Sequence, residues 1–172
     1  MARILVPLPL TDFDPTEVAV PWAALSDAGH NLIFATETGA QAAADAKTLG
    51  RGEGPLPPAS LWAHAENRAL YDGLVADNAF ASPIRWTDMA VIDCDAVLFA
   101  GGHGPGMRPY CVSPDVQRLA VKAFAAGKLV GAICHGVLPL ARARCDDGSP
   151  LLESRRTTSL TALMERMSVM MT

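Results

Sequence analysis

The feature that most constrains this chain is an apolar run that stops at a cysteine. Residues 129–133 carry only apolar side chains or glycine, Cys134 and His135 follow, and residues 137–144 are compatible with a helix. This order is typical of a strand, a tight turn and a helix, in which the turn residue projects at the carboxyl edge of a sheet. Cysteine beside histidine is a chemically sensible pair, because an imidazole can accept the thiol proton. The alternative is that Cys134 is a small core residue, as most free cysteines are.

The N-terminal part of the chain has the pattern of a βαβ unit. Residues 3–10 predict a buried strand, and residues 30–37 predict a second one. Between them, Asp14 is suited to cap a helix that begins at Pro15. Glu17 then lies in the first turn, where a carboxylate interacts favourably with the helix dipole. Such a unit predicts a parallel sheet.

The middle of the chain, about residues 40–88, is less regular. Residues 41–49 are rich in alanine and predict a short helix, residues 50–58 predict a loop, and residues 61–77 have apolar side chains at helical spacing. We expect this stretch to form a helical insertion beside the sheet. The whole chain, residues 1–172, is therefore expected to form a single domain.

Another predicted strand, which comes later in the chain, ends in glycines. Residues 96–100 predict a strand that runs into Gly101, Gly102 and His103. Glycines at such a strand end let backbone N–H groups approach a ligand closely, although this loop lacks the spacing of a phosphate-binding loop. The N–H groups of Gly102 and His135 are suited to converge on one developing negative charge.

The remaining segments complete an alternating pattern. Residues 113–126 predict a helix that leads into the apolar run before the cysteine. After the elbow, residues 146–150 predict a turn, residues 151–153 and 155–159 predict short extended segments, and residues 160–171 predict a helix. Methionines in that last segment indicate packing or a dimer contact.

Composition excludes several classes of protein. A chain of 172 residues, half of them hydrophobic, suits a single core. Its scattered basic residues and net charge of −4 argue against a nucleic-acid partner, and no apolar run is long enough to span a membrane. The N-terminus enters a strand without a cleavage pattern, so we expect a cytoplasmic protein. The four cysteines and four histidines show neither CxxC nor zinc-ligand spacing, so we expect free thiols and no metal.

Together these motifs resemble the DJ-1/PfpI (ThiJ) superfamily. The carboxylate in Asp14-Pro15-Thr16-Glu17, the run Gly101-Gly102-His103-Gly104 and the run Ala132-Ile133-Cys134-His135-Gly136 occur in the order of that superfamily. The chain is most similar to its Hsp31-like branch, which includes bacterial proteins called type 1 glutamine amidotransferase-like. The resemblance implies a flavodoxin-like α/β sandwich with a mostly parallel central sheet and helices on both faces, usually as a homodimer.

The resemblance also implies roles for single residues. Cys134 would be the nucleophile, Glu17 would reach its thiol from the first helix, and His135 would be the histidine of the dyad. The positions that match the oxyanion and substrate-binding sites of the superfamily are Gly101, Gly102 and His103, with the N–H of His135 as a second oxyanion donor. No metal and no cofactor are implied.

One departure from the branch concerns the end of the chain. Members usually continue with a further strand and helix, and Hsp31-like proteins carry there a third acidic residue that orients the histidine. This sequence ends at Thr172, which is shorter than expected for the branch. The role of the third acid therefore cannot be transferred, and Asp146, Glu153 and Glu165 are weak candidates for it.

The resemblance implies an enzyme that acts on small reactive carbonyls. Its activity would be that of glyoxalase III, the conversion of methylglyoxal to lactate without glutathione. Glutamine amidotransfer is disfavoured, because class I amidotransferases take a histidine from beyond the nucleophile and no histidine follows His135. Three alternatives stay open: a stress-response protein that senses redox state through reversible oxidation of Cys134, a holding chaperone, and an inactive truncated homologue.

Overall fold

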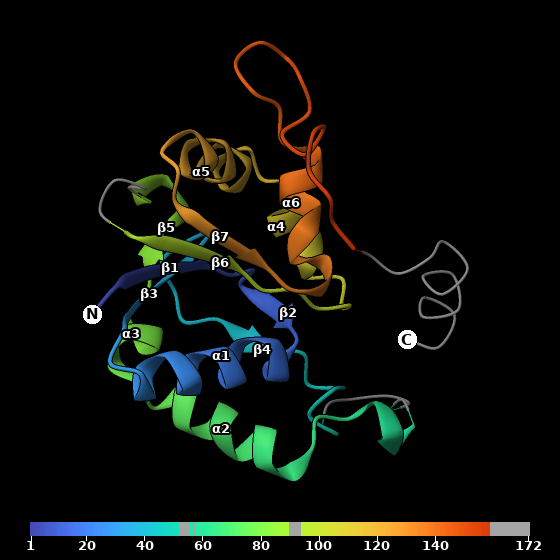
Figure 1. Cartoon of the computed structure of the whole chain (residues 1–172). Helices are drawn as coiled ribbons and strands as arrows, with labels where there is room; N and C mark the ends of the chain where they lie inside the picture. Colours follow the sequence, from blue (N-terminus) through green and yellow to red (C-terminus); the bar gives the residue numbers. More distant parts are fainter. Residues whose placement is uncertain (52–55, 57, 90–93, 159–172) are drawn as a thin grey trace.

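A five-stranded parallel sheet forms the centre of the protein (Figure 1). The computed structural model describes residues 1–51, 56, 58–89 and 94–158. The strand order is β5-β3-β1-β6-β7. The strands are β1 (Arg3–Pro7), β3 (Asn31–Thr36), β5 (Ile84–Arg85), β6 (Ala96–Phe99) and β7 (Leu129–Ala132). The prediction of a mostly parallel sheet is confirmed.

Helices cover both faces of this sheet, as predicted (Figure 1). On one face lie α1 (Pro15–Asp27), α2 (Ala65–Val75) and α3 (Asn78–Ala81). On the other lie α4 (Met107–Val112), α5 (Pro114–Ala125) and α6 (Val137–Arg142). Single 3-10 turns occur at Ala59–Leu61, Trp86–Asp88 and Cys134–Gly136. Among the helices of the described ranges, none has both the length and the apolar character to cross a bilayer.

The first helix begins where the sequence predicts. The Asp14 side chain accepts hydrogen bonds from the N–H groups of Thr16 and Glu17 at 2.8 and 3.1 Å, and Pro15 opens the helix. These contacts satisfy backbone donors that the first turn leaves unpaired. The N–H of Asp14 also donates to the carbonyl oxygen of Gly101 at 2.9 Å. The start of α1 is thereby attached to the loop that follows β6.

An aromatic cluster joins the helices α2 and α3 to Phe13 and to Phe34 of the central sheet. Phe13 packs edge-on against Tyr71 and Phe80, each with ring centroids 6.1 Å apart, and Phe34 packs against Phe80 at 5.1 Å. Edge-to-face pairs of this kind add about 0.5–1.5 kcal/mol each beyond the area that they bury. Because Phe13 lies one residue before the Asp14 cap, the cluster also fixes the entry to α1.

The helix predicted over residues 41–49 is wrong. Ala43–Ala44 instead form β4, which pairs in parallel with β2 (Thr11–Phe13). The N–H of Ala43 donates to the carbonyl oxygen of Leu10 at 3.0 Å, and the N–H of Asp45 donates to the carbonyl oxygen of Phe13 at 2.9 Å. These tertiary hydrogen bonds outweigh the helix propensity of alanine, which is worth only tenths of a kcal/mol per residue.

The segment after the elbow also differs from its prediction. Residues 151–154 form a turn instead of an extended segment, and residues 155–158 have no regular structure. The N–H of Leu151 donates to the carbonyl oxygen of Ala143 at 3.1 Å, so the chain folds back on the end of α6. The predicted helix over residues 160–171 lies outside the described residues.

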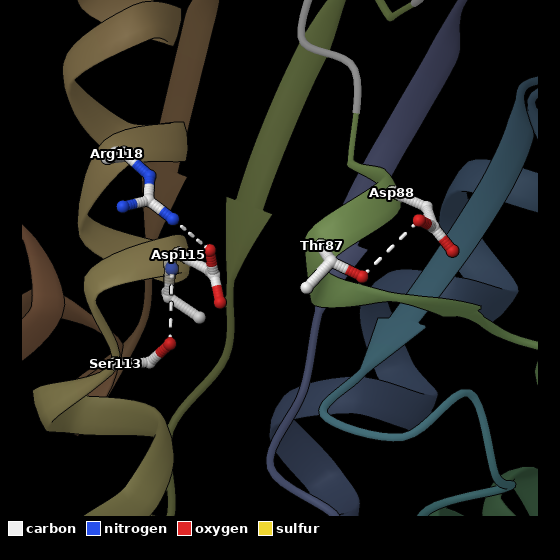
Figure 2. A network of polar contacts seen from close by, with 6 residues as sticks. Thr87, Asp88, Ser113, Asp115 and Arg118 are labelled. Atoms are coloured by element: carbon white, nitrogen blue, oxygen red, sulfur yellow. Dashed lines mark hydrogen bonds and ion pairs between the residues drawn. The ribbon is translucent and has the colours of Figure 1, made fainter.

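The helix before the elbow strand is the predicted one. Ser113 Oγ accepts from the N–H of Val116 at 3.4 Å, and Asp115 pairs with Arg118 on the helix surface (Figure 2). An exposed pair of this kind contributes little to stability, so the cap and the buried face determine the helix. The helix α5 delivers the chain to β7, the outer strand of the described sheet, where Leu129 is 75% exposed.

We predict that Gly136→Ala destabilises the fold, because β6 and the elbow approach each other too closely for a side chain. A Cβ at position 136 would lie 2.2 Å from the carbonyl oxygen of Phe99. The expected loss in the free energy of unfolding is about 1–3 kcal/mol, measured by urea denaturation. Gly73→Ala is the matched control, since its Cβ would meet Trp22 at an ordinary 3.4 Å. Equal stability of Gly136→Ala and wild type would contradict this packing.

Candidate active site

Three segments that are distant in sequence meet at the carboxyl edge of the sheet. Glu17 comes from the first turn of α1, Gly101 to His103 follow β6, and Cys134 follows β7. From the central strand β1 the chain adds β3 and β5 on one side, and it then adds β6 and β7 on the other side, so the strand order reverses between β1 and β6. Ligands bind at this point of divergence in open α/β sheets.

Cys134 lies on a strained elbow. Its φ is +51°, a conformation that residues with a side chain rarely adopt. The N–H of Ile133 donates to the carbonyl oxygen of Phe99 at 2.9 Å, and the N–H of Gly136 donates to the carbonyl oxygen of Ile133 at 2.8 Å. These hydrogen bonds fix the residues before and after Cys134. The cysteine side chain is exposed. This geometry is the one that the order of strand, cysteine and helix predicts, and it argues against Cys134 as a core residue.

Two imidazoles flank the thiol. Cys134 Sγ lies 3.6 Å from His135 Nδ1 and 4.0 Å from His103 Nε2. The two rings pack edge to face with centroids 4.7 Å apart. His135 Nδ1 also lies 2.8 Å from the carbonyl oxygen of Gly102, and because a carbonyl only accepts, the ring donates in this contact. The sequence pointed to His135 as the partner of the thiol and to His103 only as a lining residue.

The Cys134 side chain raises the pKa of His103. This pKa is raised chiefly by the hydrogen bond to Cys134, while partial burial acts in the opposite direction. The negative charge of the thiolate and of Glu17 adds to the increase. An imidazolium at His103 therefore stabilises a thiolate at Cys134.

Glu17 reaches the site from the first turn of α1. Its Oε2 accepts from the N–H of Gly101 at 2.9 Å, and its carboxyl lies close enough to the Cys134 side chain for the thiol to influence its pKa. Burial raises the pKa of Glu17, and the neighbouring carboxylate of Asp14 raises it further, whereas the interactions with Cys134 and Gly101 oppose the increase. The carboxyl of Glu17 is thus a group that can hold or share a proton at the thiol.

The paired glycines are needed for close backbone approach. A Cβ at Gly101 would lie 2.6 Å from the backbone nitrogen of His135, and one at Gly102 would lie 2.5 Å from the carbonyl oxygen of Asp12. Since the N–H of Gly101 binds Glu17, this group is engaged within the protein. Oxyanion binding by the N–H groups of Gly102 and His135 stays a prediction.

Asp12 supports the glycine-rich loop, a role that sequence reasoning missed. Its φ is +67°, and its Oδ2 accepts from the N–H of Gly106 at 2.7 Å. A Cβ at Gly104 or Gly106 would collide with the Asp12 side chain. The available signal was the residue type, because Asp tolerates positive φ better than most residues.

A cavity of about 1060 Å³ opens beside the thiol. It is lined by Cys134, both histidines and a largely apolar wall that includes Phe124 and Leu138. Of the candidates for a third acid, Asp146 and Glu153 line a separate cavity of about 520 Å³ instead, and Glu165 lies outside the described residues. Neither Asp146 nor Glu153 is therefore placed with the thiol.

We predict that backbone strain at the elbow is measurable. A left-handed conformation costs an L-residue about 1–2 kcal/mol, part of which the greater chain entropy of glycine offsets. Cys134→Gly should therefore unfold with a free energy about 1 kcal/mol higher than Cys134→Ala, although both lack the thiol. Chemical denaturation of the two variants measures the difference. A more stable alanine variant would contradict the positive φ.

The raised pKa of Glu17 predicts a pH-dependent stability. The folded state holds this proton more tightly than the unfolded chain, so ionisation costs stability as the pH rises through the raised value. Glu17→Gln should be more stable than wild type at neutral pH, and the gap should close below the ordinary range of a glutamate. Thermal unfolding from about pH 3 to about pH 8 measures the gap, because this range extends below the ordinary pKa of a glutamate, about 4.3. Glu37→Gln, an exposed site, is the control; a gap that widens on acidification would contradict the assignment.

The chain is similar to known proteins over most of its length. A family model described as ThiJ/PfpI family-like matches residues 8–172. The chain is 27% identical over 174 residues to the uncharacterized protein C14C4.04 of Schizosaccharomyces pombe, covering 96% of this chain and 61% of that protein. It is 25% identical over 154 residues to Glyoxalase 3 of Candida albicans, covering 87% and 60%. The chain therefore spans less than two thirds of the length of these curated relatives.

Solved structures share the fold. The Rapid Encystment Protein of Francisella tularensis superposes with a TM-score of 0.73 at 18% identity, over 98% of this chain and 74% of that one. Glyoxalase III of Candida albicans superposes with a TM-score of 0.68 at 19% identity, over 96% and 71%. The match of the family model to nearly the whole sequence, together with the motifs on the elbow and the glycine-rich loop, means that this chain belongs to the ThiJ/PfpI family.

Proposed function

We propose that this protein is a cysteine-dependent enzyme that converts small reactive dicarbonyls, such as methylglyoxal, to hydroxy acids without glutathione. The observation that carries the proposal is the exposed Cys134 on its strained elbow, with two imidazoles beside the sulfur and the half-buried carboxyl of Glu17 bound to the neighbouring Gly101. The similarity to Glyoxalase 3 of Candida albicans supports the same chemistry.

The first step forms a carbon–sulfur bond. The Cys134 thiolate attacks the aldehyde carbon of methylglyoxal, and the electron pair of the carbonyl moves to its oxygen. That oxygen receives a proton from the His103 imidazolium, which gives a hemithioacetal. The N–H groups of Gly102 and His135 are proposed to bind the developing oxyanion, a contribution worth about 10²–10³ in rate per donor.

The second step moves a hydrogen between the two carbons. An imidazole base, which we assign to His135, removes the proton from the sulfur-bearing carbon to give an enediolate. The proton returns to the neighbouring carbon, which was the ketone carbon, while the hydroxyl proton of the sulfur-bearing carbon passes to the oxygen of that neighbour, and a lactoyl thioester results. Positioned acid–base groups contribute about 10²–10⁴ to such transfers. One carbon is oxidised and the other reduced, so no external oxidant is required.

The last step releases the product. Water adds to the thioester carbonyl, the carbon–sulfur bond breaks, and lactate leaves with Cys134 regenerated. The cavity of about 1060 Å³ has room for the substrate and for this water. Its volume also suits dicarbonyls larger than methylglyoxal.

The test is conversion of methylglyoxal to lactate in the absence of glutathione. We expect turnover by the wild type and a loss of at least about 10³-fold in Cys134→Ser, since the nucleophile is removed. Cys145→Ser is the matched control, because Cys145 is half-buried and lines the cavity that lacks the thiol. Turnover that survives Cys134→Ser would contradict a cysteine nucleophile.

A second candidate function is redox sensing, which the exposure of Cys134 favours. Of the four cysteines, Cys94 and Cys111 are buried and Cys145 is half-buried. Burial also raises the pKa of Cys111, which disfavours its thiolate. Peroxide would oxidise the Cys134 thiolate to a sulfenate, with water as the second product. A folded protein that turns over no dicarbonyl but takes up oxygen at Cys134, detected by mass spectrometry, would support this function.

A further inference from the structure

We propose that His103, Cys134 and His135 form a reversible site for a transition-metal ion of the zinc class. The sequence shows no zinc-ligand spacing, because 31 residues separate His103 from Cys134. The fold nevertheless brings His103 Nε2, Cys134 Sγ and His135 Nδ1 within 4.8 Å of one another. This juxtaposition of β6 and β7 carries the inference.

The distances approach those of a tetrahedral site. With Zn–N bonds of about 2.0–2.1 Å and Zn–S bonds of about 2.3 Å, sulfur and nitrogen ligands lie about 3.6 Å apart. The separation of Cys134 Sγ and His135 Nδ1 is 3.6 Å, and that of Cys134 Sγ and His103 Nε2 is 4.0 Å. His103 is exposed, and the proposed site requires a rotation of its side chain that brings Nε2 closer to the sulfur than the present 4.0 Å.

The ligand types select the ion. One thiolate and two imidazoles suit zinc and its neighbours, whereas magnesium and calcium prefer oxygen ligands. Three protein ligands leave a fourth position toward the cavity, where water can bind. Binding releases any proton on the thiol to solvent, and the proton that His135 Nδ1 donates to Gly102 moves to Nε2 of the same ring, which then turns so that Nδ1 faces the ion instead of the carbonyl. The loss of that hydrogen bond opposes binding, which makes the site reversible.

Metal binding would block the nucleophile. A sulfur that donates its electron pair to zinc is not available to attack an aldehyde carbon. This consequence rests on the proposed function, whereas metal binding itself does not. A zinc-class ion would then act as an inhibitor that competes with the carbonyl substrate for Cys134.

Metal affinity is measured without reference to activity. The full chain, freed of metal and kept reduced with a non-thiol reductant, is titrated with Zn²⁺ against a chromophoric chelator. Co²⁺ serves as the spectroscopic probe, because a bound thiolate gives a charge-transfer absorption in the near ultraviolet. We expect one ion per chain, the cobalt absorption, and no binding of Mg²⁺ at the same concentration.

Variants assign the ligands. Cys134→Ser should abolish the cobalt absorption, and both His103→Ala and His103→Gln should weaken Zn²⁺ at least about tenfold. His64→Ala and Cys145→Ser are matched controls outside the cluster and should bind as wild type. Circular dichroism verifies that each variant is folded. Zn²⁺ binding that is absent, or that is unchanged in folded Cys134→Ser or His103 variants, overturns the site.

Activity separates the two proposals. Wild type that turns over methylglyoxal but binds no Zn²⁺ overturns the metal site alone. Wild type that binds Zn²⁺ through Cys134 but turns over no dicarbonyl leaves the metal site in place and removes the enzymatic proposal. If both hold, Zn²⁺ should raise the apparent KM for methylglyoxal without lowering kcat; a lower kcat at unchanged KM would overturn competition at Cys134.

Discussion

The hydrogen bond between the N–H of Gly101 and the carboxyl of Glu17 connects the first helix to the end of β6, directly beside the elbow. It requires that Gly101 have no side chain, because a Cβ there would lie 2.6 Å from the nitrogen of His135 and 2.9 Å from Glu17 Oε2. The first turn of α1, the loop after β6 and the elbow after β7 therefore lie so close together that no side chain fits between them at Gly101. The position of Glu17 beside the thiol depends on this approach.

The surroundings of the sulfur combine groups with opposite electrostatic preferences. Burial favours the protonated form of Glu17, whereas the thiol favours the charged form of His103. Both shifts favour the protonated form, so at a given pH Glu17 carries less negative charge and His103 more positive charge than the free side chains would. The strained φ of Cys134 holds the sulfur between these groups and toward the cavity.

Much of this architecture could be predicted from local signals. The caps Asp14 and Ser113 mark the beginnings of α1 and α5, and the strand, cysteine and glycine pattern identifies the elbow. The helix expected over residues 41–49 failed because β2 offers hydrogen bonds that local propensity cannot reveal. For the same reason the sequence showed His135 beside Cys134 but did not show that the ring of His103 lies only 4.0 Å from the sulfur. Proximity across 31 residues depends on the register of β6 and β7, which pairs Phe99 with Ala132.

The positive φ of Cys134 has a consequence for laboratory evolution. Strain borne by the backbone is a reserve of stability that glycine at position 134 would release, at the cost of the nucleophile. A library sorted for resistance to heat alone would therefore enrich chains that keep this fold and lose its thiol, because most proteins tolerate stabilising changes that their function does not. Thermostable forms of this protein should be sought with position 134 held constant.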